Sequence, residues 1–291
     1  MLIQFILNGI VAGSVYALVA LGFSLVYRTL RFFHFAHGAV FTAGAYTAYA
    51  VLRLGQPVVV AVLTAAVLGS VLGLVIDGLV YRPLYKRRAS SMVLFLASLG
   101  VYIFLQNAIA MIFGDSSKVL LQSRYISVYH VFGATLTNMD CWILATSCCA
   151  WLATWWSLRH SRLGKLLRAV ANDPELCTIF GISAAKVMTG TMMIGSLLSA
   201  IAGVLFALDF NATPVMGFRT LLGGITATIV GGVENVLGGY MGAIIVGVLQ
   251  HLGVWKLSTQ WQDAILYVLL LVVLLVRPSG ILSTGKARSV K

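Results

Sequence analysis

The chain has 291 residues, of which 60% are hydrophobic and only 10% are charged, with a mean hydropathy of +0.96. Water-soluble domains are about 45–50% apolar and about 25% charged, so this composition excludes a water-soluble protein. The net charge is +12. No polar segment is long enough to build a nucleic-acid-binding surface, so we assign the basic residues to positions that flank membrane spans.

Apolar stretches follow one another along the whole chain. They fall near 5–27, 33–52, 57–80, 92–113, 141–158, 187–209, 220–231, 236–252 and 262–276. A helical crossing needs about 20 apolar residues, and these runs are continuous rather than alternating, which argues against a β-barrel. We predict an all-α integral membrane protein, a multi-pass transmembrane helical bundle of about eight or nine segments. Residues 1–291 form one transmembrane domain, in which the glycine-rich region 220–252 is a broken or re-entrant element.

The distribution of basic residues predicts the orientation. With the N-terminus outside, 15 of the 20 Lys and Arg residues fall on the inner side and 5 on the outer side. This bias predicts an outside N-terminus and an inside C-terminus. Residues 114–140 then form an external loop and residues 159–186 a cytoplasmic loop. Neither loop is large enough for a catalytic domain, so we expect no enzyme activity and no catalytic residues.

The cytoplasmic loop contains the signals of a short helix over residues 174–180. Asp173 suits the N-cap, Pro174 the first helical position, and Glu175 the first turn, while Gly181 suits the C′ position. Leu176, Ile179 and Phe180 form one apolar stripe. So short a helix is marginal alone and needs a surface to dock against. The residues themselves leave two surfaces open, the membrane with the protein's own spans, or a cytoplasmic partner.

Two further clusters have a packing interpretation. His34 and His37 lack nearby Cys, Asp or Glu, so we predict packing residues and no metal site. Gly231, Gly232, Gly238 and Gly242 favour close helix packing. The four cysteines are expected to be small buried apolar residues. The alternative for the glycine-rich region is a broken helix that lines a solute path, with Glu234 and Asn235 at its turn.

Charge inside the membrane discriminates between transport mechanisms. All eight acidic residues fall near span ends, in loops or in the turn of the broken element, which argues against proton or sodium coupling. Uncharged or small groups could still line a path, namely Asn8, His37, Gly38, Gln106 and Asn107. Residues 280–287, GILSTGKA, have Ala287 where a nucleotide site needs Ser or Thr. We therefore expect no cofactor on this chain.

Five segments carry a resemblance that covers almost the whole chain. They are NGIVAGSVYALVALGFSLVYRTL, FAHGAVFTAGAY, LRAVANDPELCTIFGIS, TIVGGVENVLGGYMGAIIVGVLQ and RPSGIL. Together they resemble the membrane subunits of ABC importers for branched-chain amino acids. His34 and Ala39 stand where that family often has Asn and Asp.

The resemblance implies a coupling role for the cytoplasmic loop. It assigns contact with an ATPase subunit to Arg168, Ala169, Asp173 and Gly181, and by extension to Pro174, Glu175, Leu176, Ile179 and Phe180. It also implies a second permease chain, identical or different, two ATPase subunits that hold ATP and magnesium, an external binding protein, and a bacterial inner membrane location. The alternative is a stand-alone channel or facilitator for small polar solutes such as urea or amides.

Overall fold

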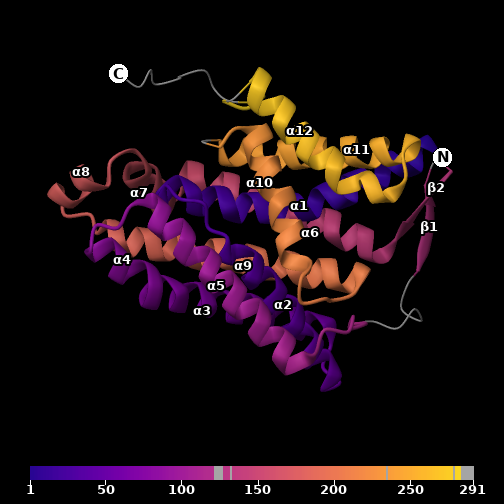
Figure 1. The fold of residues 1–291 in the computed structure, drawn as a ribbon, viewed down its shortest axis with the longest axis horizontal. Helices are drawn as coiled ribbons and strands as arrows, with labels where there is room; N and C mark the ends of the chain where they lie inside the picture. The colour runs from indigo at the N-terminus through magenta and orange to yellow at the C-terminus, as the bar shows by residue number, and fades with distance from the viewer. Residues whose placement is uncertain (121–126, 132, 234, 278, 283–291) are drawn as a thin grey trace. The chain divides into compact units, whose positions relative to one another are not determined.

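A computed structural model describes residues 1–120, 127–131, 133–233, 235–277 and 279–282. Its helices are α1 (Leu2–Leu30), α2 (Ala36–Arg53), α3 (Val58–Ile76), the π-helical η1 (Asp77–Tyr81), α4 (Arg82–Lys86), α5 (Ser91–Phe113), α6 (Asn138–His160), α7 (Arg162–Asn172), α8 (Pro174–Ile179), α9 (Ala184–Phe210), α10 (Met216–Gly231), α11 (Val236–Lys256), the 3-10 turn η3 (Thr259–Trp261) and α12 (Gln262–Val276) (Figure 1). The strands are β1 (Val128–Val131) and β2 (Ala134–Thr137).

Seven helices in the described part of the chain are long and apolar enough to cross a membrane. They are Leu2–Leu30, Val58–Lys86, Ser91–Phe113, Asn138–His160, Ala184–Phe210, Val236–Lys256 and Thr259–Val276. The predicted multi-pass α-helical fold is therefore confirmed. The predicted number of segments was approximate. The stretches near 33–52 and 220–231 are helices α2 and α10, which fall outside these seven.

One compact unit comprises Met1–Ser24, Ile126–Trp151 and Leu222–Lys291. Here α1 and α11 approach closely because glycines lack a side chain. A Cβ on Gly9 would lie 2.7 Å from the Val248 Cα, and one on Gly13 would lie 2.8 Å from the Ala243 carbonyl oxygen. These contacts run antiparallel along the two helices. Close backbone approach of this kind is a common way to pack helices inside a membrane.

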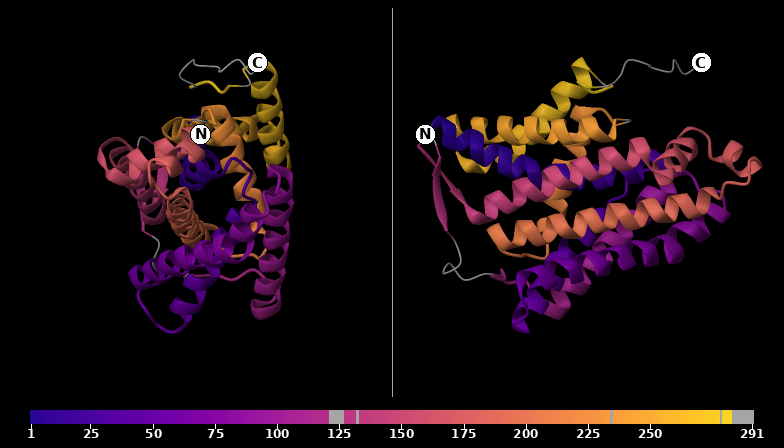
Figure 2. Two further views of the ribbon diagram at one scale, coloured as in Figure 1. Left: turned by 90° about the vertical axis from the view of Figure 1, so that its left-hand side faces the viewer. Right: turned by 180° about the vertical axis from the view of Figure 1, so that it is seen from behind.

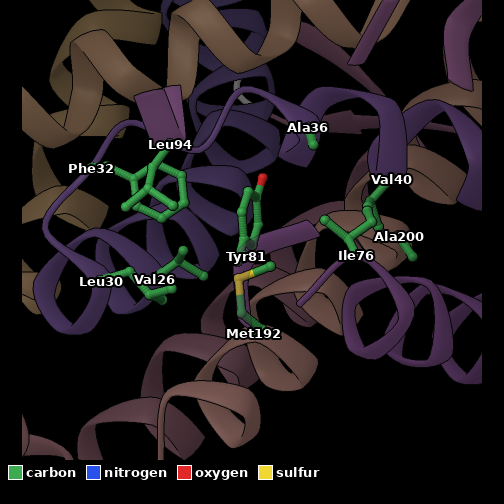
Figure 3. Close-up of a cluster of buried hydrophobic side chains, with 10 residues drawn as sticks. All are labelled: Val26, Leu30, Phe32, Ala36, Val40, Ile76, Tyr81, Leu94, Met192 and Ala200. Carbon is green, nitrogen blue, oxygen red and sulfur yellow. The ribbon is translucent and has the colours of Figure 1, made fainter. Parts of the chain in front are cut away.

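A second compact unit comprises Leu25–Tyr125 and Leu152–Leu221. Helices α2, α3 and α9 pack against one another at its centre. A Cβ on Gly44 of α2 would lie 2.6 Å from the Ala200 Cα of α9. A buried apolar cluster that includes Phe32, Tyr81 and Met192 fills the interior (Figure 3). Figure 2 shows α7 and α8 at one end of this unit, beside the start of α9.

The segment 114–140, predicted as a loop, contains regular structure. β1 and β2 form an antiparallel hairpin in which Val128 pairs with Thr137, and α6 begins at Asn138. The Gln4 side chain of α1 binds this hairpin, because its amide donates to the Thr135 carbonyl (3.0 Å) and its oxygen accepts from the Thr135 N–H (2.7 Å). The N-terminus and the hairpin therefore lie at the same end of their unit.

The prediction that all four cysteines are buried was wrong for three of them. Cys141, Cys148 and Cys149 of α6 are exposed, and only Cys177 of α8 is buried. A membrane-spanning helix is apolar on its outward positions as well as on its packed ones, so an apolar neighbourhood in the sequence does not imply burial in the protein.

Candidate functional site: the segment around α8

Helix α8 begins as its capping residues predict. The Asp173 side chain accepts hydrogen bonds from the backbone N–H groups of Glu175 (3.0 Å) and Leu176 (2.9 Å), and Pro174 occupies the first turn. The helix ends at Ile179, one residue before the predicted end. Gly181 then adopts a φ of +76°, a conformation that glycine takes without strain.

One face of α8 is anchored against α7 and α9, and the other is largely exposed. Cys177 is only 6% exposed and packs in a cluster with Val170 of α7 and Ala184 of α9. In contrast, Leu176, Ile179 and Phe180 are 50%, 79% and 75% exposed. We call these three residues the apolar stripe. A single buried side chain thus fixes the helix while three large apolar side chains point outward.

Two of the predicted coupling residues have internal contacts. The Arg168 guanidinium donates to the Leu158 carbonyl at the end of α6 (2.5 Å), and Ala169 packs against the cluster around Cys177. Both residues therefore fix the position of α7, the helix that packs against α8.

Sequence reasoning missed two residues in this region. Arg31, at the end of α1, donates to the Ala171 carbonyl of α7 (2.7 Å), and Cys177 is the buried anchor of α8. Arg31 and Ala171 are 140 positions apart, so no local pattern could reveal their contact. The signal for Cys177 was available, since it does not belong to the i, i+3, i+4 stripe formed by Leu176, Ile179 and Phe180.

The predicted path residues of the second unit lie on α2 and α5. His37 is fully buried, and its carbonyl accepts from the Ser199 hydroxyl of α9 (2.8 Å). Gly38 packs against the Gly217 backbone. Gln106 is partly exposed, and Asn107 is exposed on α5, with its amide donating to the Ile103 carbonyl (2.8 Å).

The predicted path residues of the first unit lie far apart within it. Asn8 accepts from the Gln4 amide (2.8 Å), whereas Asn235 caps α11 by accepting from the Gly238 N–H (3.0 Å). Because α1 and α11 run antiparallel, these two residues lie at opposite ends of the pair. Glu234 lies outside the described residues.

The glycines beside Asn235 lie where α10 meets α11. Gly231 contacts the Gly238 carbonyl, and Gly242 lies against the Ala227 carbonyl. Gly232 has a φ of +101° in the turn that joins the two helices. Among the described residues, no group of three His, Cys, Asp or Glu side chains is placed to hold a metal ion.

Comparison with known proteins assigns the family. The family model described as "Branched-chain amino acid transport system / permease component" matches residues 5–274. This chain belongs to that permease family. The permease is 32% identical to the high-affinity branched-chain amino acid transport system permease protein LivH of Escherichia coli, with 99% of this chain and 97% of LivH covered.

Other relatives agree with this assignment. The permease is 30% identical to BraD of Pseudomonas aeruginosa, a high-affinity branched-chain amino acid transport system permease protein, with 99% of this chain and 98% of BraD covered. Among solved structures, PsaBC from Streptococcus pneumoniae in complex with Fab matches with a TM-score of 0.47 and 14% identity, covering 96% of this chain and 91% of that chain. The family match and the seven membrane-length helices of the described residues identify the chain as an integral membrane transport permease.

Proposed function

We propose that this permease is the membrane-spanning subunit of an ABC importer that takes up branched-chain or other hydrophobic amino acids. Transport is driven by a separate ATPase subunit, which holds the ATP and magnesium. The relatives LivH and BraD support the substrate class, because both are named as permeases of high-affinity branched-chain amino acid transport systems.

The observation that carries the ATPase-coupling proposal is the geometry of α8. The apolar stripe is 50–79% exposed on a helix that is capped by Asp173 and anchored by Cys177. A short amphipathic helix with exposed apolar residues is suited to a groove on another protein. Among the predicted coupling residues, Leu176, Ile179 and Phe180 make the contact, while Arg168 and Ala169 support it.

The importer requires further partners and a fixed orientation. A second permease chain completes the membrane part, and an external binding protein delivers the amino acid near residues 114–140. The protein lies in the bacterial inner membrane with its N-terminus outside. The bias of Lys and Arg supports this orientation. The contact between Gln4 and Thr135 places the N-terminus and the hairpin within residues 114–140 on one side, as the predicted topology requires.

A stand-alone facilitator is the alternative, and α8 argues against it. A facilitator needs no cytoplasmic docking element, yet this chain maintains a capped and anchored helix whose apolar residues face outward.

Co-purification tests the coupling proposal. We expect the parent chain to retain an ATPase subunit in detergent, and the double variant I179D/F180D to lose it, because two carboxylates cannot be buried in an apolar groove without partners. Leu163→Asp is the matched control, since Leu163 is 62% exposed on α7 in the same cytoplasmic segment. Retention of the ATPase by I179D/F180D would contradict the proposal.

A further inference from the structure

A buried carboxylate lies where α3 gives way to the π-helical segment η1. Asp77, the first residue of η1, is only 2% exposed. A buried carboxylate is costly unless charged or polar groups compensate it. The Arg82 guanidinium of α4 provides one such group, with its Nε 3.2 Å from the Asp77 Oδ2.

Thr189 of α9 contacts both Asp77 and Arg82. Its hydroxyl lies 2.5 Å from the Asp77 Oδ2, 2.6 Å from the Arg82 Nη2 and 2.9 Å from the Ala185 carbonyl. A hydroxyl has one proton to donate, and the charged carboxylate is the closer acceptor. Thr189 therefore donates to Asp77 and accepts from Arg82. We call these three residues the triad.

The triad lies close to the cytoplasmic segment. Thr189 is five residues after Ala184, the first residue of α9, which is about 7.5 Å along the helix axis. Ala184 packs in the cluster that anchors Cys177 of α8. The same end of α9 thus contacts α8 through apolar side chains and contacts η1 through the triad.

The segment η1 also has a polar contact with the connection between α1 and α2. Tyr81, its last residue, is fully buried, and its hydroxyl lies 2.8 Å from the His34 Nδ1 in the connection between α1 and α2. Figure 3 shows the Tyr81 ring within the buried apolar cluster. Such π-helical turns often occur at functional sites. Polar contacts therefore run from α9 through η1 to the start of α2.

We propose that the triad transmits a displacement of α8 to α3 and η1, so that Asp77 and Thr189 are positioning residues of the transport cycle. This inference rests on the proposed function, in which the ATPase moves α8. Nearby on the same helices, Met192 of α9 and Ile76 of α3 belong to one buried apolar cluster. Apolar side chains slide past one another, whereas hydrogen bonds to charged groups resist displacement because they are stronger and directional.

Thr189→Val tests the triad without changing the shape of the side chain. Thr191→Val is the matched control, because Thr191 is also buried on α9 but its hydroxyl bonds the Val187 carbonyl of its own helix. Thr189→Ser keeps the hydroxyl. Each variant is reconstituted in liposomes with the second permease chain, the ATPase and the binding protein, and both leucine uptake and ATP hydrolysis are measured.

We expect T189V to lower leucine uptake by about tenfold or more, because hydrogen bonds to a charged group are lost, while ATP hydrolysis stays within about twofold. T189S and T191V should keep the parent's uptake per ATP within about twofold. This ratio separates a coupling role from a structural one, since a poorly folded variant loses both activities together.

Three results would overturn the inference. In the first, T189V transports as much leucine per ATP hydrolysed as the parent. In the second, T189V loses uptake and ATP hydrolysis in proportion. In the third, T191V loses as much uptake per ATP as T189V does. If the parent itself shows no ATP-dependent uptake, the proposed function fails, and this inference fails with it. The parent and the variant thus report on the two proposals separately.

Discussion

At the residue scale, glycines determine how closely the helices of the second unit can approach. Gly203 of α9 lies against the Phe41 carbonyl of α2, whereas a Cβ on Gly190 of the same helix would have no heavy atom within 4 Å beyond its own neighbourhood. We therefore expect alanine to be poorly tolerated at Gly203 and well tolerated at Gly190.

We expect Gly203→Ala to destabilise the protein by about 1–3 kcal/mol, because the added methyl group forces α2 and α9 apart. Gly190→Ala should leave stability unchanged or raise it slightly, because alanine favours the helix and meets no obstacle. Thermal unfolding of the purified protein in detergent measures both. Equal unfolding temperatures for the two variants would contradict the packing described for α2 and α9.

Asp173 is the second residue with a specific role, since its carboxylate satisfies two N–H groups at the start of α8. Asp173→Ala removes this cap and destabilises the helix by about 1 kcal/mol. A helix of six residues is only marginally stable, so this loss is large for α8. We expect D173A to weaken ATPase co-purification. Asp173→Asn should restore it, because Asn caps equally well. If D173N does not restore co-purification, the negative charge of Asp173, and not its capping hydrogen bonds, is what ATPase binding requires.

At the element scale, α3 and α5 present different outward faces. The exposed positions of α3 include Val67 and Val71, whereas α5 exposes Asn107 near Phe104 and Met111. An amide that faces lipid is costly, so the Asn107 face of α5 is suited to a solute path or a partner chain, while α3 is suited to lipid.

Cysteine accessibility tests this difference. In a chain whose three exposed cysteines are replaced by alanine and whose buried Cys177 is kept, we expect Asn107→Cys to react with a water-soluble thiol reagent in the assembled transporter, and leucine with its binding protein to slow that reaction. Val67→Cys should not react, because lipid surrounds it. Unreactive N107C would remove Asn107 from the predicted path.

The sequence predicted those elements whose signals are local. The cap and stop of α8 are encoded within nine residues, and the spans follow from continuous apolar runs. The triad was not predictable, because Asp77 and Thr189 are 112 positions apart. The hairpin of β1 and β2 was also missed, since two four-residue strands in a polar connection give too short a pattern to recognise.

At the scale of the whole molecule, the distribution of charge predicts an outside N-terminus. In the chain without its three exposed cysteines, Ser117→Cys should be labelled by an impermeant thiol reagent in cells whose inner membrane is accessible and intact. Lys165→Cys should be labelled only after the inner membrane is opened. Both residues are exposed in the structure, so burial cannot explain a negative result. The reverse pattern of labelling would contradict the orientation.

The geometry of the candidate site was predictable around α8 and less so for the proposed path residues. The stripe of Leu176, Ile179 and Phe180 follows from helical spacing, and the structure exposes all three side chains. The path residues were chosen by polarity alone, which does not encode distance, and the structure places Asn8 and Asn235 at opposite ends of one helix pair. Their role in transport stays a prediction.

ATP-dependent uptake tests the central claim most directly. The permease, its partner permease chain, the ATPase and the binding protein are reconstituted in liposomes, and leucine uptake is measured with and without ATP. We predict uptake against a gradient that requires ATP and the binding protein, and that I179D/F180D abolishes. Equal downhill flux without ATP, unaffected by I179D/F180D, would contradict the account and establish a facilitator.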